Sequence, residues 1–186
     1  MKNLKVKRAV FLDRDGTINE DIGDLYTVEK LRFIPGAIDA LKLLQERFLL
    51  FIITNQAGIG KGNFTESQFL KFNKEYLNIL KKEDIKIEEV YYCPHTEYDN
   101  CICRKPKTYF VDIASKKYNL ELKESYIVGD HPSDVEIGSR TRMKSMFLLT
   151  GHGKKHIDEI INIPGILISE NIYDAALLSL KLTEKL

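Results

Sequence analysis

The chain has 186 residues, of which 44% are hydrophobic, and its formal net charge at pH 7 is +1. That length suits one domain with a sizeable core, so we expect residues 1–186 to form a single domain. The charged residues are interspersed and form no basic stripe, which argues against a nucleic-acid partner.

The N-terminal residues 1–8 are basic, but the apolar segment behind them, 9–12, is short and ends at Asp13. Such a segment is neither a signal peptide nor a membrane span. We therefore expect a cytoplasmic protein with no membrane partner, and a monomer because the sequence shows no exposed apolar stripe. The three cysteines, an odd number, argue against a disulfide framework and favour metal or redox use.

Apolar runs that predict strands alternate along the chain with segments of helical periodicity. Strands are expected at residues 9–12, 48–53, 87–92, 125–129, 146–149 and 166–168. One helix is expected in the segment that Pro35-Gly36 opens, where Ile38, Leu41, Leu44 and Phe48 approximate helical spacing. Others are expected from the capping-box sequence that begins at Thr65, at 108–118, and after each of the last two strands. Continuous apolar strands alternating with helices indicate a mainly parallel sheet covered on both faces, a Rossmann-like three-layer α/β/α sandwich.

Polar groups follow three of these predicted strands. Asp13-Arg14-Asp15-Gly16-Thr17 comes directly after the first strand, Thr54-Asn55-Gln56 ends the second, and Gly129-Asp130 ends a later one. Taken alone, the paired acids could be ordinary turn residues. Because the carboxyl ends of parallel strands meet at one edge of the sheet, the coincidence of all three favours a functional site there.

The paired acids suit phosphate ester hydrolysis in two steps. Asp13 can attack as a carboxylate nucleophile, while Asp15 can protonate the leaving oxygen and later activate water. Magnesium would offset the negative charge, held by Asp13, the carbonyl of Asp15 and Asp130. Asp134, one helical turn further on, could orient a metal-bound water or simply favour the helix dipole.

Further groups could bind the phosphate. Thr54 offers a hydroxyl, and the amides around Asn55 can bind phosphate oxygens. The glycine-rich stretch 57–62 is a weak signal and is interpreted as a flexible loop. Arg104 and Lys105 could bring positive charge to the substrate, although an exposed pair of this kind is usually just solvated. Whether Arg104 and Lys105 face the substrate depends on the segment that precedes them.

That segment contains every cysteine of the chain and one histidine. Cys93, His95, Cys101 and Cys103 form a C-x-H and C-x-C arrangement, the ligand set of a closed tetrahedral zinc site. Closed coordination leaves no position for catalysis, so this zinc would pin a zinc-binding loop and aim Arg104 and Lys105. The alternative is three free thiols on a surface loop.

Together these motifs resemble the haloacid dehalogenase superfamily, subfamily III. Asp13 to Thr17 resembles its first motif, Thr54-Asn55 the second, Lys105 the third, and Gly129-Asp130 with Asp134 the fourth. An acid at Asp15 is similar to the phosphatases and mutases of the superfamily rather than its dehalogenases. No inserted segment is long enough for a cap domain, and such capless members generally take small phosphorylated metabolites or macromolecular ends.

Within the superfamily, residues 11–19, 54–59, 91–95 and 103–106 are similar to the heptose bisphosphate phosphatases of lipopolysaccharide synthesis. This resemblance implies removal of the C7 phosphate of heptose 1,7-bisphosphate, with Asp13 as nucleophile and Asp15 as acid and base. It also implies that Lys105 steadies the phosphoryl group and that Arg104 recognises the substrate. The pocket would be lined by residues 54–57 and by a flap from Asp21 to Asp24, hence by Asn55, Gln56, Ala57, Asp21 and Asp24.

Two alternatives stay open at this point. The short stretch between His95 and Cys101, and the Cys-Arg-Lys-Pro ending, also resemble the histidinol-phosphate phosphatases. His131 stands where a lysine or arginine is common, which leaves the substrate less secure than the reaction type. A phospho-accepting signalling domain would also carry aspartates at strand ends, but it would need neither the zinc loop nor Asp15 as an acid.

Overall fold

The computed structural model describes residues 6–183, and its centre is a six-stranded sheet in the order β3-β2-β1-β4-β5-β6. Every neighbouring pair of strands is parallel. The strands are β1 (Ala9–Leu12), β2 (Leu49–Asn55), β3 (Ile87–Cys93), β4 (Tyr126–Gly129), β5 (Lys144–Leu148) and β6 (Leu167–Ser169). The prediction of a parallel sheet is confirmed.

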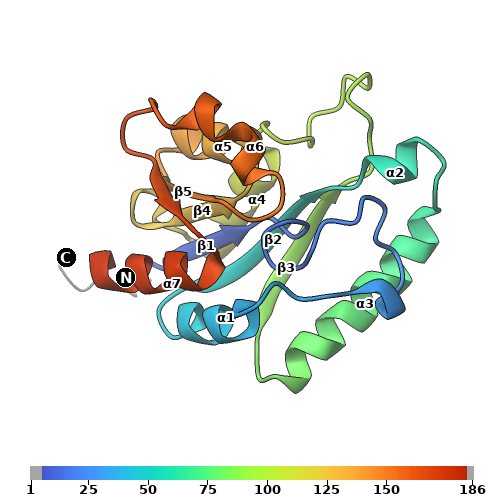
Figure 1. Cartoon of the computed structure of the whole chain (residues 1–186), viewed down its shortest axis with the longest axis horizontal. Coiled ribbons are helices and arrows are strands. Elements are labelled where there is room, and N and C mark those ends of the chain that lie inside the picture. The colour runs from blue at the N-terminus through green and yellow to red at the C-terminus, as the bar shows by residue number, and fades with distance from the viewer. Residues whose placement is uncertain (1–5, 184–186) are drawn as a thin grey trace.

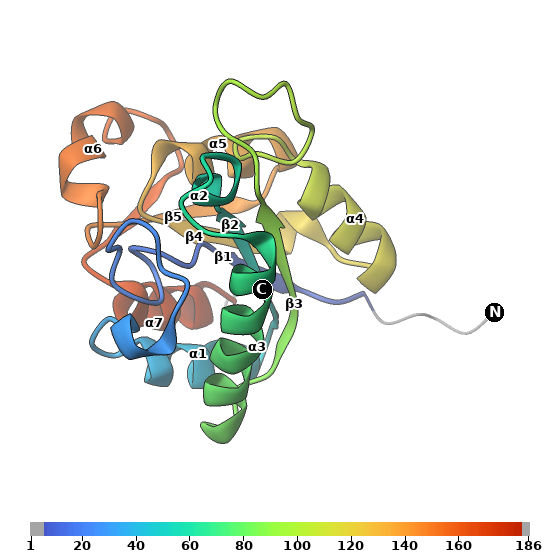
Figure 2. The same ribbon diagram turned by 90° about the vertical axis from the view of Figure 1, so that its right-hand side faces the viewer.

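Helices cover both faces of the sheet (Figures 1 and 2). One layer consists of α1 (Ala37–Gln45), α3 (Glu66–Lys82) and α7 (Ile172–Thr183). The other consists of α4 (Tyr109–Tyr118), α5 (Pro132–Thr141) and α6 (Gly153–Ile160). Short turns of helix occur at α2 (Ala57–Gly60), η1 (Val28–Lys30) and η2 (Leu122–Glu124). The three-layer sandwich is therefore as expected, whereas the stretch 57–62, expected to be a flexible loop, contains the helical turn α2.

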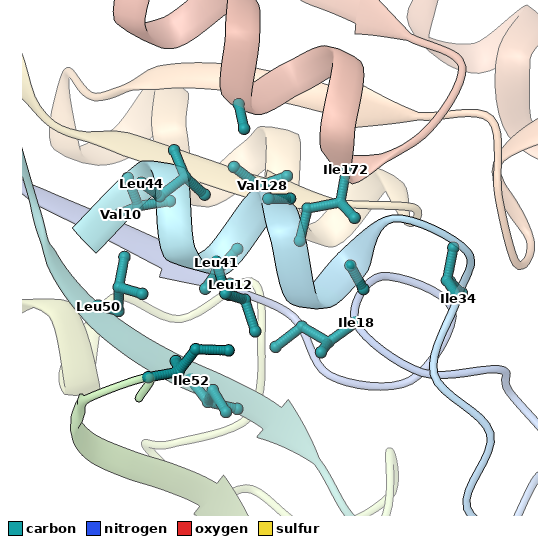
Figure 3. Close-up of a cluster of buried hydrophobic side chains, with 14 of the residues drawn as sticks. Val10, Leu12, Ile18, Ile34, Leu41, Leu44, Leu50, Ile52, Val128 and Ile172 are labelled. Atoms are coloured by element: carbon teal, nitrogen blue, oxygen red, sulfur yellow. The ribbon is translucent and has the colours of Figure 1, made fainter. Parts of the chain in front are cut away.

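The apolar residues of β1 serve both layers at once. Val10 and Leu12 belong to the core beneath α1, α3 and α7, part of which Figure 3 shows, whereas Ala9 and Phe11 belong to the core beneath α4 and α5. All four are fully buried. Because side chains alternate across a strand, a strand covered on both faces needs an unbroken apolar run. Burying each large side chain contributes about 1.5–3 kcal/mol.

The start of α3 and the end of α1 can be compared with the helix limits predicted from the sequence. At the start of α3, Thr65 Oγ1 accepts a hydrogen bond from the Gln68 backbone N–H at 3.2 Å, and Gln68 Oε1 accepts one from Thr65 N–H at 2.8 Å, so the capping box is confirmed. In contrast, α1 ends at Gln45, although the apolar spacing extends to Phe48. The ring of Phe48 packs edge-on against Tyr126 at 5.5 Å, just before β2 begins, so its spacing reflects the shared core.

The order of the strands places a crevice above β1. From β1 the chain proceeds outward to β2 and β3, then returns to β4 on the opposite side of β1 and proceeds to β5 and β6. Ligands of such sheets bind where the order reverses, at the carboxyl ends of the strands. Within residues 6–183 no cap domain covers this end, since the connection from β1 to α1 contains only η1. No helix in the same range is long and apolar enough to cross a membrane.

Candidate active site

A pocket of about 640 Å³ lies at the carboxyl ends of β1, β2 and β4. Five of the residues predicted to act on phosphate or metal line it, namely Asp13, Asp15, Thr54, Lys105 and Asp130. The six residues predicted to bind substrate line it as well: Asp21, Asp24, Asn55, Gln56, Ala57 and Arg104. Asp134 lies behind the pocket and is buried. Residues from five separate segments of the chain therefore meet at the sheet edge predicted from the sequence.

Lys105 joins the first and last of the predicted motifs. Its ammonium lies 2.8 Å from Asp13 Oδ1 and 2.8 Å from Asp134 Oδ1, and all three side chains are nearly inaccessible to solvent. Burial by itself lowers the pKa of Lys105, but the carboxylates of Asp13 and Asp134 outweigh it and hold the pKa above its usual value. Lys105 therefore carries a fixed positive charge beside Asp13.

The two oxygens of the Asp13 carboxylate differ in their hydrogen bonding. Asp13 Oδ1 accepts a hydrogen bond from the Arg14 backbone N–H at 2.7 Å in addition to its contact with Lys105. Among residues 6–183, no hydrogen bond to Asp13 Oδ2 is present. The carboxylate is thus held by one oxygen, and the other is available to a phosphorus atom or a cation in the pocket.

Asp15 is held by four side-chain hydrogen bonds. Arg14 donates from Nε to Oδ1 at 3.2 Å and from Nη2 to Oδ2 at 2.8 Å. Asn19 Nδ2 donates to Oδ1 at 2.8 Å, and Gln56 Nε2 donates to Oδ2 at 3.0 Å. Both carboxylate oxygens therefore have two donors each, which fixes the plane of the Asp15 carboxyl group at the pocket wall.

The end of β2 supplies a buried hydroxyl and a brace for Lys105. Thr54 Oγ1 accepts a hydrogen bond from Gln56 Nε2 at 2.8 Å, which leaves its own hydrogen to be donated to a ligand. Asn55 Oδ1 accepts a bond from the Lys105 backbone N–H at 3.0 Å. The Asn55 side chain is thus committed to holding the segment that carries Lys105.

Three carboxylates form a group suited to a cation. Oxygens of Asp13, Asp130 and Asp134 lie within 4.8 Å of one another, and oxygen donors of this kind are those that Mg²⁺ prefers. Burial raises the pKa of Asp130 to about 6, so its negative charge is poorly compensated by protein groups alone. Gly16 has φ of +80°, and a Cβ there would overlap the Asp130 carboxylate. Glycine is therefore required where the turn after β1 meets Asp130.

Cys93, His95, Cys101 and Cys103 come together in the loop after β3. Cys93 Sγ lies 3.7 Å from Cys101 Sγ and 3.1 Å from Cys103 Sγ, and His95 Nδ1 lies 3.6 and 3.3 Å from the sulfurs of Cys93 and Cys103. The sulfurs around a tetrahedral zinc ion with 2.3 Å bonds are about 3.8 Å apart. The distance from Cys93 to Cys101 matches this value and the distance from Cys93 to Cys103 is shorter, so the donor set is compatible with zinc. Arg104 Nη1 donates to the His95 carbonyl at 3.2 Å, which links this loop to the pocket.

The flap after β1 is anchored at both sides of the pocket. Asp21 Oδ2 lies 3.0 Å from His152 Nε2, and Asp24 Oδ2 accepts a hydrogen bond from Asn63 Nδ2 at 2.7 Å. The flap thus spans from the loop before α6 to the loop before α3. Its acidic side chains form one part of the pocket rim.

Several residues of the site were not predicted from the sequence. Arg14 and Asn19 bond to Asp15, and the backbone N–H of His152 donates to Asp130 Oδ2 at 2.7 Å. Their contacts bring together residues far apart in the chain or depend on side-chain direction, neither of which periodicity reveals. Arg14 did carry one signal, since a cation directly between two acids is placed to pair with one of them.

Several known proteins are similar to this chain in sequence. A sequence model of the HAD-hydrolase-like family matches residues 102–175. D-glycero-beta-D-manno-heptose-1,7-bisphosphate 7-phosphatase of Haemophilus influenzae is 36% identical over 179 residues, covering 87% of this chain and 97% of that protein. D-glycero-alpha-D-manno-heptose-1,7-bisphosphate 7-phosphatase of Campylobacter jejuni is 37% identical over 164 residues, covering 83% of this chain and 94% of that protein.

A solved structure agrees on the fold. The crystal structure of D,D-heptose 1,7-bisphosphate phosphatase from B. bronchiseptica, complexed with magnesium and phosphate, superposes with a TM-score of 0.86 at 24% identity. The match covers 94% of this chain and 99% of that one.

The parallel sheet and its acidic carboxyl edge define a phosphatase of the haloacid dehalogenase type, a hydrolase of phosphoric monoesters. With relatives of this similarity over nearly their full length, the chain belongs to the D-glycero-D-manno-heptose-1,7-bisphosphate 7-phosphatase family.

Proposed function

We propose that residues 1–186 form one phosphatase domain that removes the C7 phosphate of D-glycero-D-manno-heptose 1,7-bisphosphate through an aspartyl-phosphate on Asp13. The observation that carries this proposal is the buried contact of Asp13 with Lys105, beside Asp15 and Thr54 in one pocket. The names of the relatives support the choice of substrate.

In the first step the free oxygen of Asp13 attacks phosphorus, and the bond between phosphorus and the C7 oxygen breaks. In this step Asp15 carries a proton on an oxygen from which one of its four hydrogen-bond donors has withdrawn, and it gives that proton to the C7 oxygen so that the heptose leaves as an alcohol. Lys105 and the Thr54 hydroxyl stabilise the negative charge on the phosphoryl oxygens. The step leaves a phosphoryl group on Asp13 and a carboxylate at Asp15.

In the second step Asp15 takes a proton from water, which attacks phosphorus as Asp13 departs. This restores the Asp13 carboxylate and the proton on Asp15, and inorganic phosphate leaves. No cap domain lies over the pocket within residues 6–183, so the pocket is open to solvent, which suits a small metabolite that enters and leaves freely.

Asp13, the backbone carbonyl of Asp15 and Asp130 would hold Mg²⁺, with Asp134 acting indirectly through Lys105. When bound, the ion supplies positive charge that lets an anionic phosphate approach an anionic nucleophile. The charge balance of the site supports this role. With every group ionised, the four carboxylates of Asp13, Asp15, Asp130 and Asp134 outnumber the two cations of Arg14 and Lys105 by two negative charges.

Cys93, His95, Cys101 and Cys103 would hold a structural zinc ion. Four protein ligands close a tetrahedral site, so this ion would not contact substrate. Its role would be to fix the loop from which Arg104 and Lys105 extend into the pocket. The hydrogen bond from Arg104 to the His95 carbonyl supports that connection.

The rim of the pocket suits a sugar bisphosphate. Arg104 and Lys61 bring positive charge, which favours binding of the phosphate that is not hydrolysed. Asp21 and Asp24 on the flap can accept hydrogen bonds from sugar hydroxyls. Ala57, Asn55 and Gln56 complete the wall between them.

The decisive experiment compares kcat/KM for both anomers of heptose 1,7-bisphosphate, for heptose 1-phosphate and for histidinol phosphate. We expect multiple turnovers with Mg²⁺, release of one phosphate from the bisphosphate, and little release from heptose 1-phosphate. Faster hydrolysis of histidinol phosphate would overturn the substrate assignment. Stable phosphorylation of the protein without turnover would overturn the assignment as a hydrolase.

A further inference from the structure

Arg14 is a charged side chain with no exposure to solvent, although it stands between two residues of the pocket. Its guanidinium extends away from the pocket into the core beneath α3, where the rings of Phe69 and Phe72 lie 5.6 and 5.2 Å from its Cζ atom. Both rings are themselves buried. Aromatic walls of this kind restrict a guanidinium to one plane and contribute cation–π attraction.

Burial of Arg14 is not explained by stability. Removing a charge from water is costly, and a well-packed apolar residue of similar volume often stabilises the fold as much or more. Moreover, the Nη1 atom of Arg14 is buried and has no hydrogen-bond partner among the described residues 6–183. An unsatisfied buried donor destabilises the fold further. The arrangement therefore points to a role for the donors that are used.

The Arg14 donors that form hydrogen bonds contact the Asp15 carboxylate and the Leu25 carbonyl. Nε and Nη2 of Arg14 form a fork on the two oxygens of Asp15, at 3.2 and 2.8 Å. A fork of two parallel bonds fixes the plane of a carboxylate, whereas a lysine ammonium would supply one point of attachment. The remaining contact of Nη2, with the Leu25 carbonyl at 3.5 Å, ties the same guanidinium to the residue that follows the flap Asp21–Asp24.

Gln56 donates a second hydrogen bond to Asp15 Oδ2, the oxygen that also accepts from Arg14 Nη2. Its Nε2 atom lies 3.0 Å from Asp15 Oδ2 and 2.8 Å from Thr54 Oγ1, and the side chain is buried. One amide group thus connects the carboxyl of Asp15 with the hydroxyl of Thr54. Because Gln56 extends from the end of β2 and Arg14 from the end of β1, Asp15 is fixed relative to two strands of the sheet.

We propose that Arg14 and Gln56 are positioning residues that fix the carboxyl group of Asp15 in the direction from which it protonates the leaving oxygen. This inference rests on the proposed function, in which Asp15 is the general acid. Neither residue touches the reacting atoms. Arg14 acts from the core and Gln56 from the pocket wall, so that the packing of α3 and the end of β2 together determine where the acid lies.

The test uses two substrates that are nearly identical in shape but differ in their need for an acid. p-Nitrophenyl phosphate releases a stable phenolate, whereas p-nitrobenzyl phosphate releases an alcohol that must be protonated. The kcat/KM value reports the steps up to the first departure of the leaving group, so the ratio of the two values isolates protonation. A variant that is damaged only in its general structure would lower both values by the same factor.

The variants are Arg14→Lys, which keeps the charge but loses the fork, and Gln56→Met, which keeps the volume but loses the amide. Asp15→Asn serves as the reference for loss of the acid. Arg32→Lys serves as the matched control, because Arg32 is exposed and, among residues 6–183, its guanidinium donates to the carbonyls of Glu29 and Leu31 and to no residue of the pocket. Circular dichroism and the thermal midpoint establish that each variant is folded.

We expect Asp15→Asn, Arg14→Lys and Gln56→Met to lose roughly ten- to a hundredfold more activity on p-nitrobenzyl phosphate than on p-nitrophenyl phosphate. Arg32→Lys should leave the ratio unchanged. If Asp15→Asn shows the selective loss but a folded Arg14 or Gln56 variant does not, the positioning role is wrong while the proposed function stands. If Asp15→Asn shows no selective loss, the role of Asp15 as acid fails, and the positioning role fails with it. Should Arg14→Lys not fold, Gln56→Met decides.

Discussion

The ammonium of Lys105 lies 2.8 Å from Asp13 Oδ1 in an environment where both side chains are almost completely buried. The same ammonium reaches Asp134, so one cation serves two carboxylates that would otherwise face each other in a medium of low dielectric constant. This contact connects the end of β1 with the loop after β3 that carries the cysteine cluster, and with the first turn of α5. It is therefore both a structural bond and a means of supplying charge to the phosphoryl group.

Replacing Lys105 with methionine should weaken the fold as well as the reaction. Removing one partner of a buried ion pair typically costs about 3–5 kcal/mol, because the remaining charge has no compensation. We expect the free energy of urea unfolding at pH 7 to fall by about that amount, and kcat/KM to fall as well. Lys42→Met is the control, since Lys42 pairs with Glu83 at the surface and should change stability by about 1 kcal/mol or less. Equal effects of the two substitutions would contradict the buried role of Lys105.

Asp13→Asn removes the nucleophile while keeping its shape. We expect turnover to fall roughly ten-thousandfold or more, which is the scale seen when a nucleophile is removed. The fold and the affinity for substrate should be largely retained, as measured by the thermal midpoint and by calorimetric titration with substrate. Near-normal turnover in this variant would rule out Asp13 as the nucleophile.

The pKa of Asp130 predicts how metal-free stability depends on pH. Burial raises this pKa to about 6 from an ordinary value of 3.8, so ionisation is harder in the folded chain than in the unfolded chain. Below about pH 4 Asp130 is protonated in both states and does not oppose folding. Its ionisation destabilises the folded chain increasingly as the pH rises from about 4 to about 6, and the penalty is complete above about pH 6. The full penalty is about 3 kcal/mol, at about 1.4 kcal/mol for each pH unit of difference.

Asp130→Asn should remove that penalty. In magnesium-free buffer, the stability of the variant relative to the wild type should increase between pH 4.5 and pH 7, as measured by urea unfolding. Added Mg²⁺ should raise the thermal midpoint of the wild type but not that of the variant. Asp158→Asn, at an exposed position of α6, serves as the control and should show neither effect. A constant difference in stability across this pH range would refute the assignment.

Removal of the metal from the cysteine cluster should affect both folding and substrate binding. Protein purified without chelator should contain about one zinc ion per chain, and Cys101→Ser should contain much less. Because structural zinc contributes to folding free energy, we expect a clear fall in the thermal midpoint and a rise in KM through displacement of Arg104. Ile102→Ala, at the exposed neighbouring position, should change neither zinc content nor KM. Zinc content far below one ion per chain in the wild type would defeat the proposal.

The sequence was informative wherever one local pattern had one structural solution. An unbroken apolar run such as Ala9–Leu12 suits a strand that is buried on both faces, and Thr65 with Gln68 suits a helix start. The same holds for the cluster of Cys93, His95, Cys101 and Cys103, whose donors lie within ten residues of each other. Its limit was visible at Phe48, where helical spacing extended past the end of α1 because the residue belongs to the same core.

The sequence by itself determined the order of the elements, the edge of the sheet at which the acids gather, and the candidate ligands in the loop after β3. These follow from periodicity and from the rule that parallel strands share one carboxyl edge. Only the tertiary structure decided that Lys105 pairs with Asp13 and Asp134, that Asn55 braces Lys105, and that Arg14 points into the core to hold Asp15. Such contacts depend on side-chain direction and on the register of strands far apart in the chain. The two acids after Leu12 thus have their chemistry from the sequence and their geometry from the fold.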